Sequence, residues 1–246
     1  LCIVAALGTT GTTANDPLEP ISDIASRYGI WLHVDAAYAG TALILPEYQH
    51  LIEGIDAVDS FVFNPHKWMF TNFDISAYFI REREWLVRTF EILPEYLKTD
   101  PDGQVNNYCD WGIPLGRRFR ALKLWFVLRN YGKKGLQERL RTHLSYADFI
   151  REQVDAESTF EQVIKTDYNL VCFRYLPPGI SDPQRLNHIN QDLMNQLNDS
   201  GKLFLSHTKV NGIYTIRMVI GQTYVTMDHV QKAWDTILKA SRNLDY

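Results

Sequence analysis

Three short apolar runs near the start of the chain constrain its fold more than any other feature. Residues 2–7, 30–34 and 59–63 are each a few residues long and mostly apolar, which predicts three strands. The continuous run at 2–7 is typical of a strand buried on both faces of a sheet. Between the first two runs, a helical pattern opens at Pro20 and stops at Gly29, as helices often do at these residue types. The order strand, helix, strand predicts an α/β fold with a mostly parallel sheet and helical crossovers.

Residues with functional chemistry follow each of these runs directly. Gly8-Thr9-Thr10 closes the first run, Asp35 ends the second, and Asn64-Pro65-His66-Lys67 follows the third. In open parallel sheets, ligands bind beyond the carboxyl ends of the strands. We therefore expect these three segments to line one pocket.

Asp35 and Lys67 suit one cofactor in particular. A lysine amine can form a Schiff base with the aldehyde of pyridoxal phosphate, while a carboxylate can pair with the pyridine nitrogen and keep it protonated. The sequence therefore predicts a pyridoxal phosphate site. Two plainer interpretations stay open, namely Lys67 as a surface charge and Asp35 as the cap of a helix that follows it. The small residues after Asp35 favour the cofactor site, because they would let a flat ring approach the backbone.

The segments around these two residues resemble a known family nearly letter for letter. Residues 33–40 read His-Val-Asp-Ala-Ala-Tyr-Ala-Gly, and residues 64–68 read Asn-Pro-His-Lys-Trp. Both are similar to segments of the group II pyridoxal phosphate-dependent amino-acid decarboxylases, above all the aromatic-L-amino-acid decarboxylases. The resemblance covers roughly the C-terminal half of family chains and implies an aspartate-aminotransferase-like (fold type I) α/β enzyme. Residues 1–125 would form part of its large parallel-sheet, cofactor-binding domain, and residues 126–246 its small C-terminal α/β domain.

The resemblance also implies an activity. A carboxy-lyase of this family would convert an L-amino acid, of the dopa, tyrosine, tryptophan or 5-hydroxytryptophan type, to its amine and carbon dioxide. Family members are homodimers with shared active sites, so the same assembly is expected here. Trp68 and Gly116 favour the aromatic branch over the glutamate decarboxylases. The alternatives are an aromatic aldehyde synthase, a decarboxylase of a non-aromatic amino acid, and an inactive structural or binding homologue.

The same matching implies a role for each site residue. Lys67 would hold the cofactor and Asp35 would pair with its ring nitrogen. Asn64 would donate to the phosphate, with a plain Asn-Pro turn as the alternative, and Thr10 would lie near the cofactor's polar edge. His66 would contact the phosphate end or the substrate carboxylate, although a purely structural histidine is the alternative.

Two further residues gain roles from the resemblance. Tyr96 lies in a stretch from residue 93 to 107 that has little periodicity, which predicts a long mobile loop. A tyrosine at the matching family position acts as the acid that protonates Cα after carbon dioxide leaves, whereas an exposed loop tyrosine is the alternative. Gly116 matches a position where glycine accompanies bulky aromatic substrates, and a glycine at a helix entry is its alternative. Cys109 departs from the arginine of the vertebrate enzymes, which puts that arginine's function in doubt here.

Periodicity predicts the remaining elements. Leu136, Leu140, Leu144, Ala147 and Ile150 recur at steps of three and four, which indicates the buried stripe of a helix. The other expected elements are helices at 84–91, 115–131, 183–198 and 227–244, and strands at 75–80, 170–176, 202–206 and 214–220. Gly132 is the expected stop of the second helix and Thr226 the N-cap of the last. The domain boundary is expected within 123–132.

Composition excludes other classes of function. The 246 residues carry a net charge of -4 without a block of like charge, so neither nucleic acid nor a membrane is an expected partner. Three widely spaced cysteines and seven histidines show no metal-ligand spacing. The cysteines are expected to be reduced thiols in a cytoplasmic protein. The apolar opening from Leu1 to Leu7 is too short to span a bilayer and reads as a strand of a longer protein.

Overall fold

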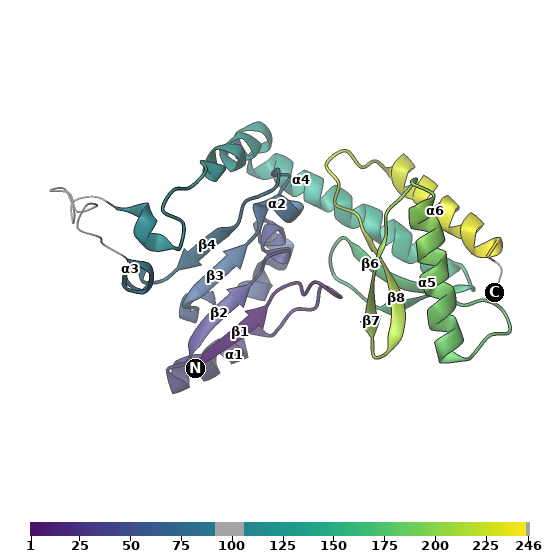
Figure 1. Ribbon diagram of the computed structural model, residues 1–246, viewed down its shortest axis with the longest axis horizontal. Coiled ribbons are helices and arrows are strands. Elements are labelled where there is room, and N and C mark those ends of the chain that lie inside the picture. The colour runs from purple at the N-terminus through teal and green to yellow at the C-terminus, as the bar shows by residue number, and fades with distance from the viewer. Residues whose placement is uncertain (92–105, 245–246) are drawn as a thin grey trace.

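The first half of the chain forms a mixed sheet. The computed structural model describes residues 1–91 and 106–244. Its first sheet has the order β1 (Cys2–Ala6), β2 (Trp31–Asp35), β3 (Ser60–Phe63) and β4 (Ala77–Ile80). β1, β2 and β3 pair in parallel, and β4 pairs antiparallel to β3. The predicted mostly parallel sheet is therefore confirmed (Figure 1).

Short helices cover one face of this sheet. α1 (Leu18–Tyr28) begins two residues before the predicted Pro20 and ends at Gly29, whose φ is 60°. Proline is tolerated in the first turn of a helix because the N–H groups there have no partner within the helix. The other helical segments are η1 (Ala39–Ile44), η2 (Pro46–Ile52), η3 (Ile55–Ala57), α2 (Pro65–Trp68), α3 (Arg83–Phe90) and η5 (Tyr108–Trp111).

The expectation that residues 2–7 form a strand buried on both faces is wrong for the described residues. Leu32 and Val34 are fully buried beneath the covering helices. Side chains of a strand alternate between the two faces, and the opposite face holds Val4, which is 60% exposed, together with the exposed Asp35. One face of the sheet is thus packed. The other is covered only in part, where Trp31 meets Trp85 at 4.8 Å between ring centroids.

The second half of the chain forms an antiparallel sheet of order β5 (Phe160–Ile164), β6 (Leu170–Tyr175), β8 (Ile213–Val219) and β7 (Ser206–Val210). Two expectations fail here. The strand predicted at 202–206 lies instead at 206–210, and β5 was not predicted at all. Both are edge strands with polar residues, such as Glu161 and Lys209, so their apolar pattern is weak.

Three helices pack on this second sheet. α5 (Pro183–Asp199) and α6 (Met227–Arg242) match their predictions within two residues, and Thr226 caps α6 as expected. The Thr226 hydroxyl accepts from the backbone of His229, whose side chain in turn accepts from the Thr226 backbone. The core between helices and sheet contains Leu193, Trp234 and Phe173.

The long α4 (Arg120–Ala156) connects the two sheets (Figure 1). The backbone leaves helical geometry at Gly132, with φ 62° and ψ 177°, so the predicted interruption is confirmed. The predicted start at residue 115 is wrong, because α4 begins at Arg120. There Asp74 holds both Arg118 and Arg120 in ion pairs of 3.2 Å. Before Gly132 the predicted apolar face exists but is exposed, whereas the stripe after it is largely buried.

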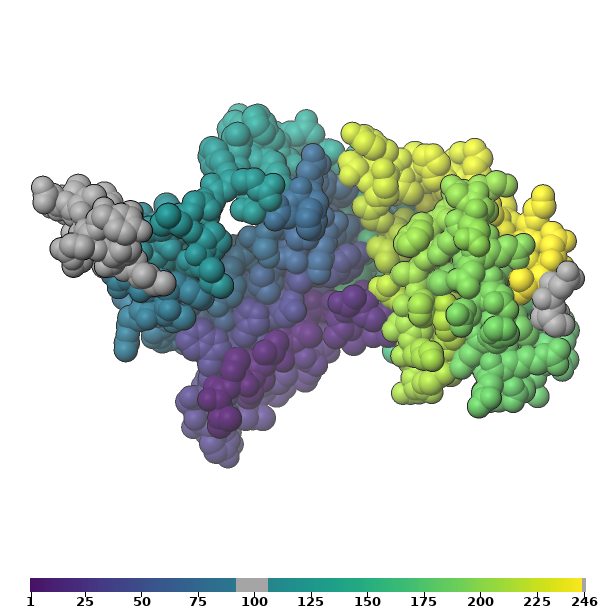
Figure 2. Space-filling model, in the orientation of Figure 1, coloured from purple at the N-terminus to yellow at the C-terminus, as the bar shows by residue number. Residues whose placement is uncertain are grey.

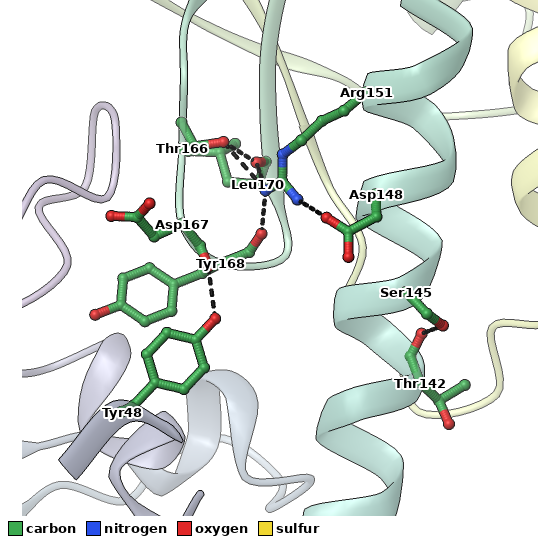
Figure 3. A network of polar contacts seen from close by, with 9 residues as sticks. All are labelled: Tyr48, Thr142, Ser145, Asp148, Arg151, Thr166, Asp167, Tyr168 and Leu170. Atoms are coloured by element: carbon green, nitrogen blue, oxygen red, sulfur yellow. Dashed lines mark hydrogen bonds and ion pairs between the residues drawn. The ribbon is translucent and has the colours of Figure 1, made fainter. Parts of the chain in front are cut away.

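Arg151 of α4 fixes the loop that leads into β6 (Figure 3). Its guanidinium donates to the carbonyls of Tyr168 and Leu170 and to the hydroxyl of Thr166. From the first half of the chain, the Tyr48 hydroxyl donates to the Asp167 carbonyl at 2.7 Å. The loop from 165 to 169 is therefore a fixed contact between the two halves, which meet beside the turn after β1 (Figure 2).

Candidate active site

The parallel register brings the predicted segments to one edge of the sheet. Ala6 pairs with Asp35, and Asp35 pairs with Val62. The carboxyl ends of β1, β2 and β3 are therefore neighbours. The turn with Thr10 leaves β1 at this edge and α2 with Lys67 follows β3 there.

Asp35 both shapes its own turn and offers a charge to the site. Its Oδ1 accepts from the backbone N–H of Ala37 at 2.9 Å, and its own carbonyl accepts from Leu7 at 2.9 Å. The helix-cap interpretation is wrong, because η1 begins at Ala39 with Tyr38 as its N-cap, and the Asp35 carboxylate closes a local turn instead. A carboxylate accepts hydrogen bonds on both oxygens, so Oδ2 can still serve a ligand, and the side chain is exposed.

Lys67 lies on a helix of only four residues. Pro65 occupies the first position of α2, and the Lys67 N–H donates to the Asn64 carbonyl at 2.9 Å. The Asn64 side-chain Oδ1 accepts from the hydroxyl of Ser76, which sequence reasoning missed. Because Oδ1 is used in this way, the Asn64 amide presents its Nδ2 as a donor. The Lys67 side chain is exposed while Trp68 beside it is buried.

The small residues around Asp35 pack closely against the neighbouring strands, and the expected approach of a flat ring stays a prediction. A Cβ added to Gly40 would lie 2.4 Å from the Cβ of Phe63, and one added to Gly8 would lie 2.5 Å from that of Ala39. Ala36 and Ala39 are themselves buried. These positions are small because the turn after β2 packs closely on β1 and β3.

His66 is engaged by the backbone. Its Nδ1 lies 2.5 Å from the carbonyl oxygen and 3.1 Å from the amide nitrogen of Ile75. The ring also meets Phe73 edge-on, with 4.9 Å between centroids. These contacts support the structural alternative for His66, and its role toward a ligand stays a prediction.

The second half of the chain holds the turn that carries Thr10. Arg217 of β8 donates to the carbonyls of Thr10 at 2.6 Å and Gly11 at 2.8 Å. The Tyr168 hydroxyl donates to Asn15 Oδ1 at 2.8 Å. An isolated arginine within a strand gives no sequence signal for such a contact, so both residues were missed.

Tyr38 connects the turn after Asp35 to the same loop. Its hydroxyl donates to Asn169 Oδ1 at 2.6 Å. Burial raises the pKa of Tyr38 far above its ordinary value, so the hydroxyl stays protonated and remains a donor. The sequence motif alone did not indicate this partner, which lies 131 residues away.

Tyr96 and Gly116 are the two remaining candidate site residues. Tyr96 lies outside the described residues. Gly116 precedes α4 by four positions, so it is not a helix-entry glycine, and a Cβ added there would meet no atom within 4 Å. Its proposed effect on substrate choice stays a prediction. The described residues contain no cluster of histidine, cysteine, aspartate or glutamate able to hold a metal ion.

The groups at this edge fit pyridoxal phosphate. The edge offers an exposed amine at Lys67, an oriented and exposed carboxylate at Asp35, and an amide donor at Asn64. These are the types of group that an aldehyde, a pyridine nitrogen and a phosphate require.

Comparison with known proteins also indicates a pyridoxal phosphate site. The family model described as the pyridoxal-dependent decarboxylase conserved domain matches residues 1–176. Tyrosine decarboxylase 2 of Narcissus pseudonarcissus is 44% identical over 236 residues, which are 94% of this chain and 47% of that protein. The chain spans about half the length of the curated relatives it matches.

Solved structures show the same fold. A structure of Oryza sativa TDC with PLP and tryptamine matches with a TM-score of 0.94 and 37% identity, covering 98% of this chain and 50% of that one. The structure of Rhodiola rosea 4-hydroxyphenylacetaldehyde synthase matches with a TM-score of 0.87 and 34% identity, over 99% and 50%. Because the family model covers more than half of the residues, the chain belongs to the pyridoxal-dependent decarboxylase family.

Proposed function

We propose that the protein containing this chain is a pyridoxal phosphate-dependent decarboxylase that converts an aromatic L-amino acid to its amine and carbon dioxide. The observation that carries the proposal is the placement of Asp35 and Lys67 at the carboxyl ends of neighbouring parallel strands. Relatives and neighbours named for tyrosine and tryptophan decarboxylation support the aromatic substrate.

Each residue has a defined task in this proposal. Lys67 holds the cofactor through its amine, and the negative charge of Asp35 keeps a proton on the ring nitrogen. Asn64 and Thr10 contact its polar groups. The bound cofactor supplies the electron sink that allows the Cα–carboxylate bond to break. Tyr96 returns a proton to Cα, and the absence of a side chain at Gly116 leaves room for an aromatic ring.

The cofactor assignment has a direct test. Borohydride reduction of the purified protein followed by peptide mapping should place a pyridoxyl group on Lys67. Asp35→Asn should retain that adduct and lose most activity, since the ring nitrogen loses its anionic partner. An unmodified Lys67 would favour the inactive structural or binding homologue, and near-normal turnover of Asp35→Asn would refute the role of the carboxylate.

The choice between decarboxylase and aldehyde synthase depends on Tyr96. The similarity to the Rhodiola rosea synthase supports the second activity as an alternative, whereas a tyrosine at position 96 favours amine formation. Tyr96→Phe should reduce amine release by about 100-fold or more, the scale of losing a positioned acid. Dioxygen should then oxidise the unprotonated carbanion, with water completing the deamination, to give aldehyde, ammonia and hydrogen peroxide. Unchanged amine release by this variant, or aldehyde as the main wild-type product, would refute the assignment.

We also propose a homodimer with a shared active site. An exposed apolar surface, defined here as Ile113, Leu115, Phe119, Trp125 and Phe126, supports this proposal because monomers seldom expose so many large apolar groups together. The Asp74 ion pairs hold the surface beside the loop that follows α2. Trp125→Asp should shift the mass measured by light scattering from dimer to monomer, and an unchanged mass would place the interface elsewhere.

The domain division stays as proposed, with residues 1–125 in the large domain and 126–246 in the small one. The two separate sheets support it.

A cytoplasmic location is also proposed. The described residues hold their three cysteines as free thiols, which supports a reducing compartment. Within the described residues, the helices are too short or too polar to cross a bilayer.

A further inference from the structure

Trp68 lies at the junction between the two halves of the molecule, directly after Lys67. Its side chain is 1% exposed. The indole stacks on Tyr38, with 5.5 Å between centroids and 7° between planes, and meets Tyr168 edge-on at 6.2 Å. Its Nε1 donates to Nδ1 of His143 at 3.1 Å. Trp68 is thus held by two aromatic rings and at its polar atom.

His143 of α4 accepts this bond as a neutral imidazole. The side chain is buried, with 2% exposure. Burial and, less strongly, the charge of Arg139 lower the pKa of His143 to about 4. Since Nδ1 accepts from Trp68, the ring proton resides on Nε2. The backbone of Gln222, in the loop after β8, acts in the opposite direction and raises the pKa of His143 by a smaller amount.

The surroundings of His143 leave little freedom for the ring. Phe70 lies against it at 5.5 Å between centroids. The Arg139 guanidinium lies over Phe70 at 5.3 Å and donates to the Thr223 carbonyl. The imidazole therefore lies between two parts of the molecule. Its Nδ1 accepts from Trp68 of α2 in the first half, and its neighbour Arg139 donates to the loop after β8 in the second.

α2 depends on such external contacts for its orientation. It has four residues and no side-chain cap at its N-terminus, and a helix this short has little stability of its own. The buried side chains of α2 are Pro65 and Trp68. The anchored indole therefore restrains the position of the α2 backbone, which carries Lys67 one residue away.

We propose that His143 is a positioning residue for Lys67: through its bond to Trp68 it fixes the short helix that presents the lysine amine to the cofactor. This inference rests on the proposed role of Lys67. His143 touches neither cofactor nor substrate in this arrangement. It sets the direction from which the amine approaches, and it couples that direction to the loop after β8.

The test compares three variants in the complete natural protein. His143→Leu removes the acceptor at similar volume, and His143→Gln retains one acceptor and one donor. Trp68→Phe removes only the indole donor and keeps an aromatic ring in the stack. Thr142→Ala, a neighbour on α4 whose hydroxyl bonds within the helix, is the matched control. The measurements are cofactor affinity, the protonation midpoint of the Lys67–cofactor linkage by absorbance, and thermal unfolding without cofactor.

We expect His143→Leu to weaken cofactor binding about tenfold, equal to about 1.4 kcal/mol and within the cost of an unpaired buried donor. The midpoint of the linkage should shift as well. Trp68→Phe should have the same effect, the double variant should be no worse, and His143→Gln should restore affinity to within about threefold. If His143→Leu fails to fold, the cofactor affinity and linkage midpoint of Trp68→Phe, compared with those of wild type, test the inference.

Two results would overturn the inference. Variants that lower only the unfolding temperature, with unchanged cofactor affinity and midpoint, would make His143 merely structural. Effects of His143→Leu and Trp68→Phe that add independently would show that the bond between them is not responsible. A wild-type protein without cofactor on Lys67 would overturn the proposed function as well, so the two failures are distinguishable.

Discussion

Replacement of Arg151 by methionine should destabilise the protein through one backbone carbonyl rather than through the ion pair. The Arg151 guanidinium donates to the Tyr168 carbonyl, to the Leu170 carbonyl at 3.0 Å, and to Asp148 at 2.6 Å. In the variant, the Leu170 carbonyl still accepts from the Thr166 hydroxyl. The Tyr168 carbonyl loses its charged donor.

The magnitude follows from these contacts. An unpaired buried carbonyl costs about 1–3 kcal/mol. The ion pair adds between 0 and about 1 kcal/mol, because the Asp148 side chain is 65% exposed. Removing the buried Nε of Arg151, which has no partner among the described residues, returns part of this loss. The net cost is about 2 kcal/mol, equal to a fall of about 4–8 °C in the unfolding temperature for a chain of this size.

The assay is denaturant and thermal unfolding of the cofactor-free protein, followed by tryptophan fluorescence. Asp148→Ala is the matched control, since it removes the ion pair and leaves the carbonyl contacts in place. It should cost less than about 1 kcal/mol. Equal losses in the two variants, or a loss below about 0.5 kcal/mol for Arg151→Met, would refute the role of the carbonyl contacts.

Three further predictions concern local geometry. Thr226→Ala should lower the unfolding free energy by about 1 kcal/mol, measured in urea, because α6 loses its cap. Gly8→Ala should cost more than Gly29→Ala in the same assay. Both glycines have positive φ, but only the new Cβ at Gly8 would lie 2.5 Å from another atom. The pKa of His143 falls from 6.5 to about 4 on folding, so the unfolded chain binds the proton first. Stability should therefore decline as pH drops from about 6.5 toward 4, by at most about 3 kcal/mol, and His143→Gln should flatten this slope.

The sequence predicted the parts of the fold that depend on local pattern. A run of apolar residues closed by a turn is recognisable within a few positions, so the strands ending at Ala6, Asp35 and Phe63 were all found. The buried stripe of α4 after Gly132 was found in the same way, because its period repeats over several turns.

The predictions from sequence failed where tertiary contacts determine the secondary structure. β5 and β7 are edge strands, and their pairing with β6 and β8 supplies what their composition does not. The start of α4 lies five residues later than predicted, where Asp74, far earlier in the chain, pairs with Arg118 and Arg120. No local pattern carries information about such a partner.

The same distinction applies to the candidate site. The placement of Asp35 and Lys67 at one edge of the sheet could be predicted, because parallel strands place their carboxyl ends together. Arg217 and Asn169 were missed, although they hold the turns on which Thr10 and Tyr38 lie. Their contacts span more than a hundred residues and use side chains that are common in strands and loops.

The motif around Asp35 is specific because four of its residues each contact a different neighbour. Val34 fills the core beneath the sheet, and Ala37 donates its N–H to the Asp35 carboxylate. Tyr38 reaches the loop before β6 through Asn169, while Gly40 lies so close to Phe63 that no Cβ fits. Four independent constraints thus act on one short segment. A bound cofactor would require only the carboxylate of Asp35 directly. The residues that follow Asp35 are constrained by the packing of their turn between two strands and the second sheet.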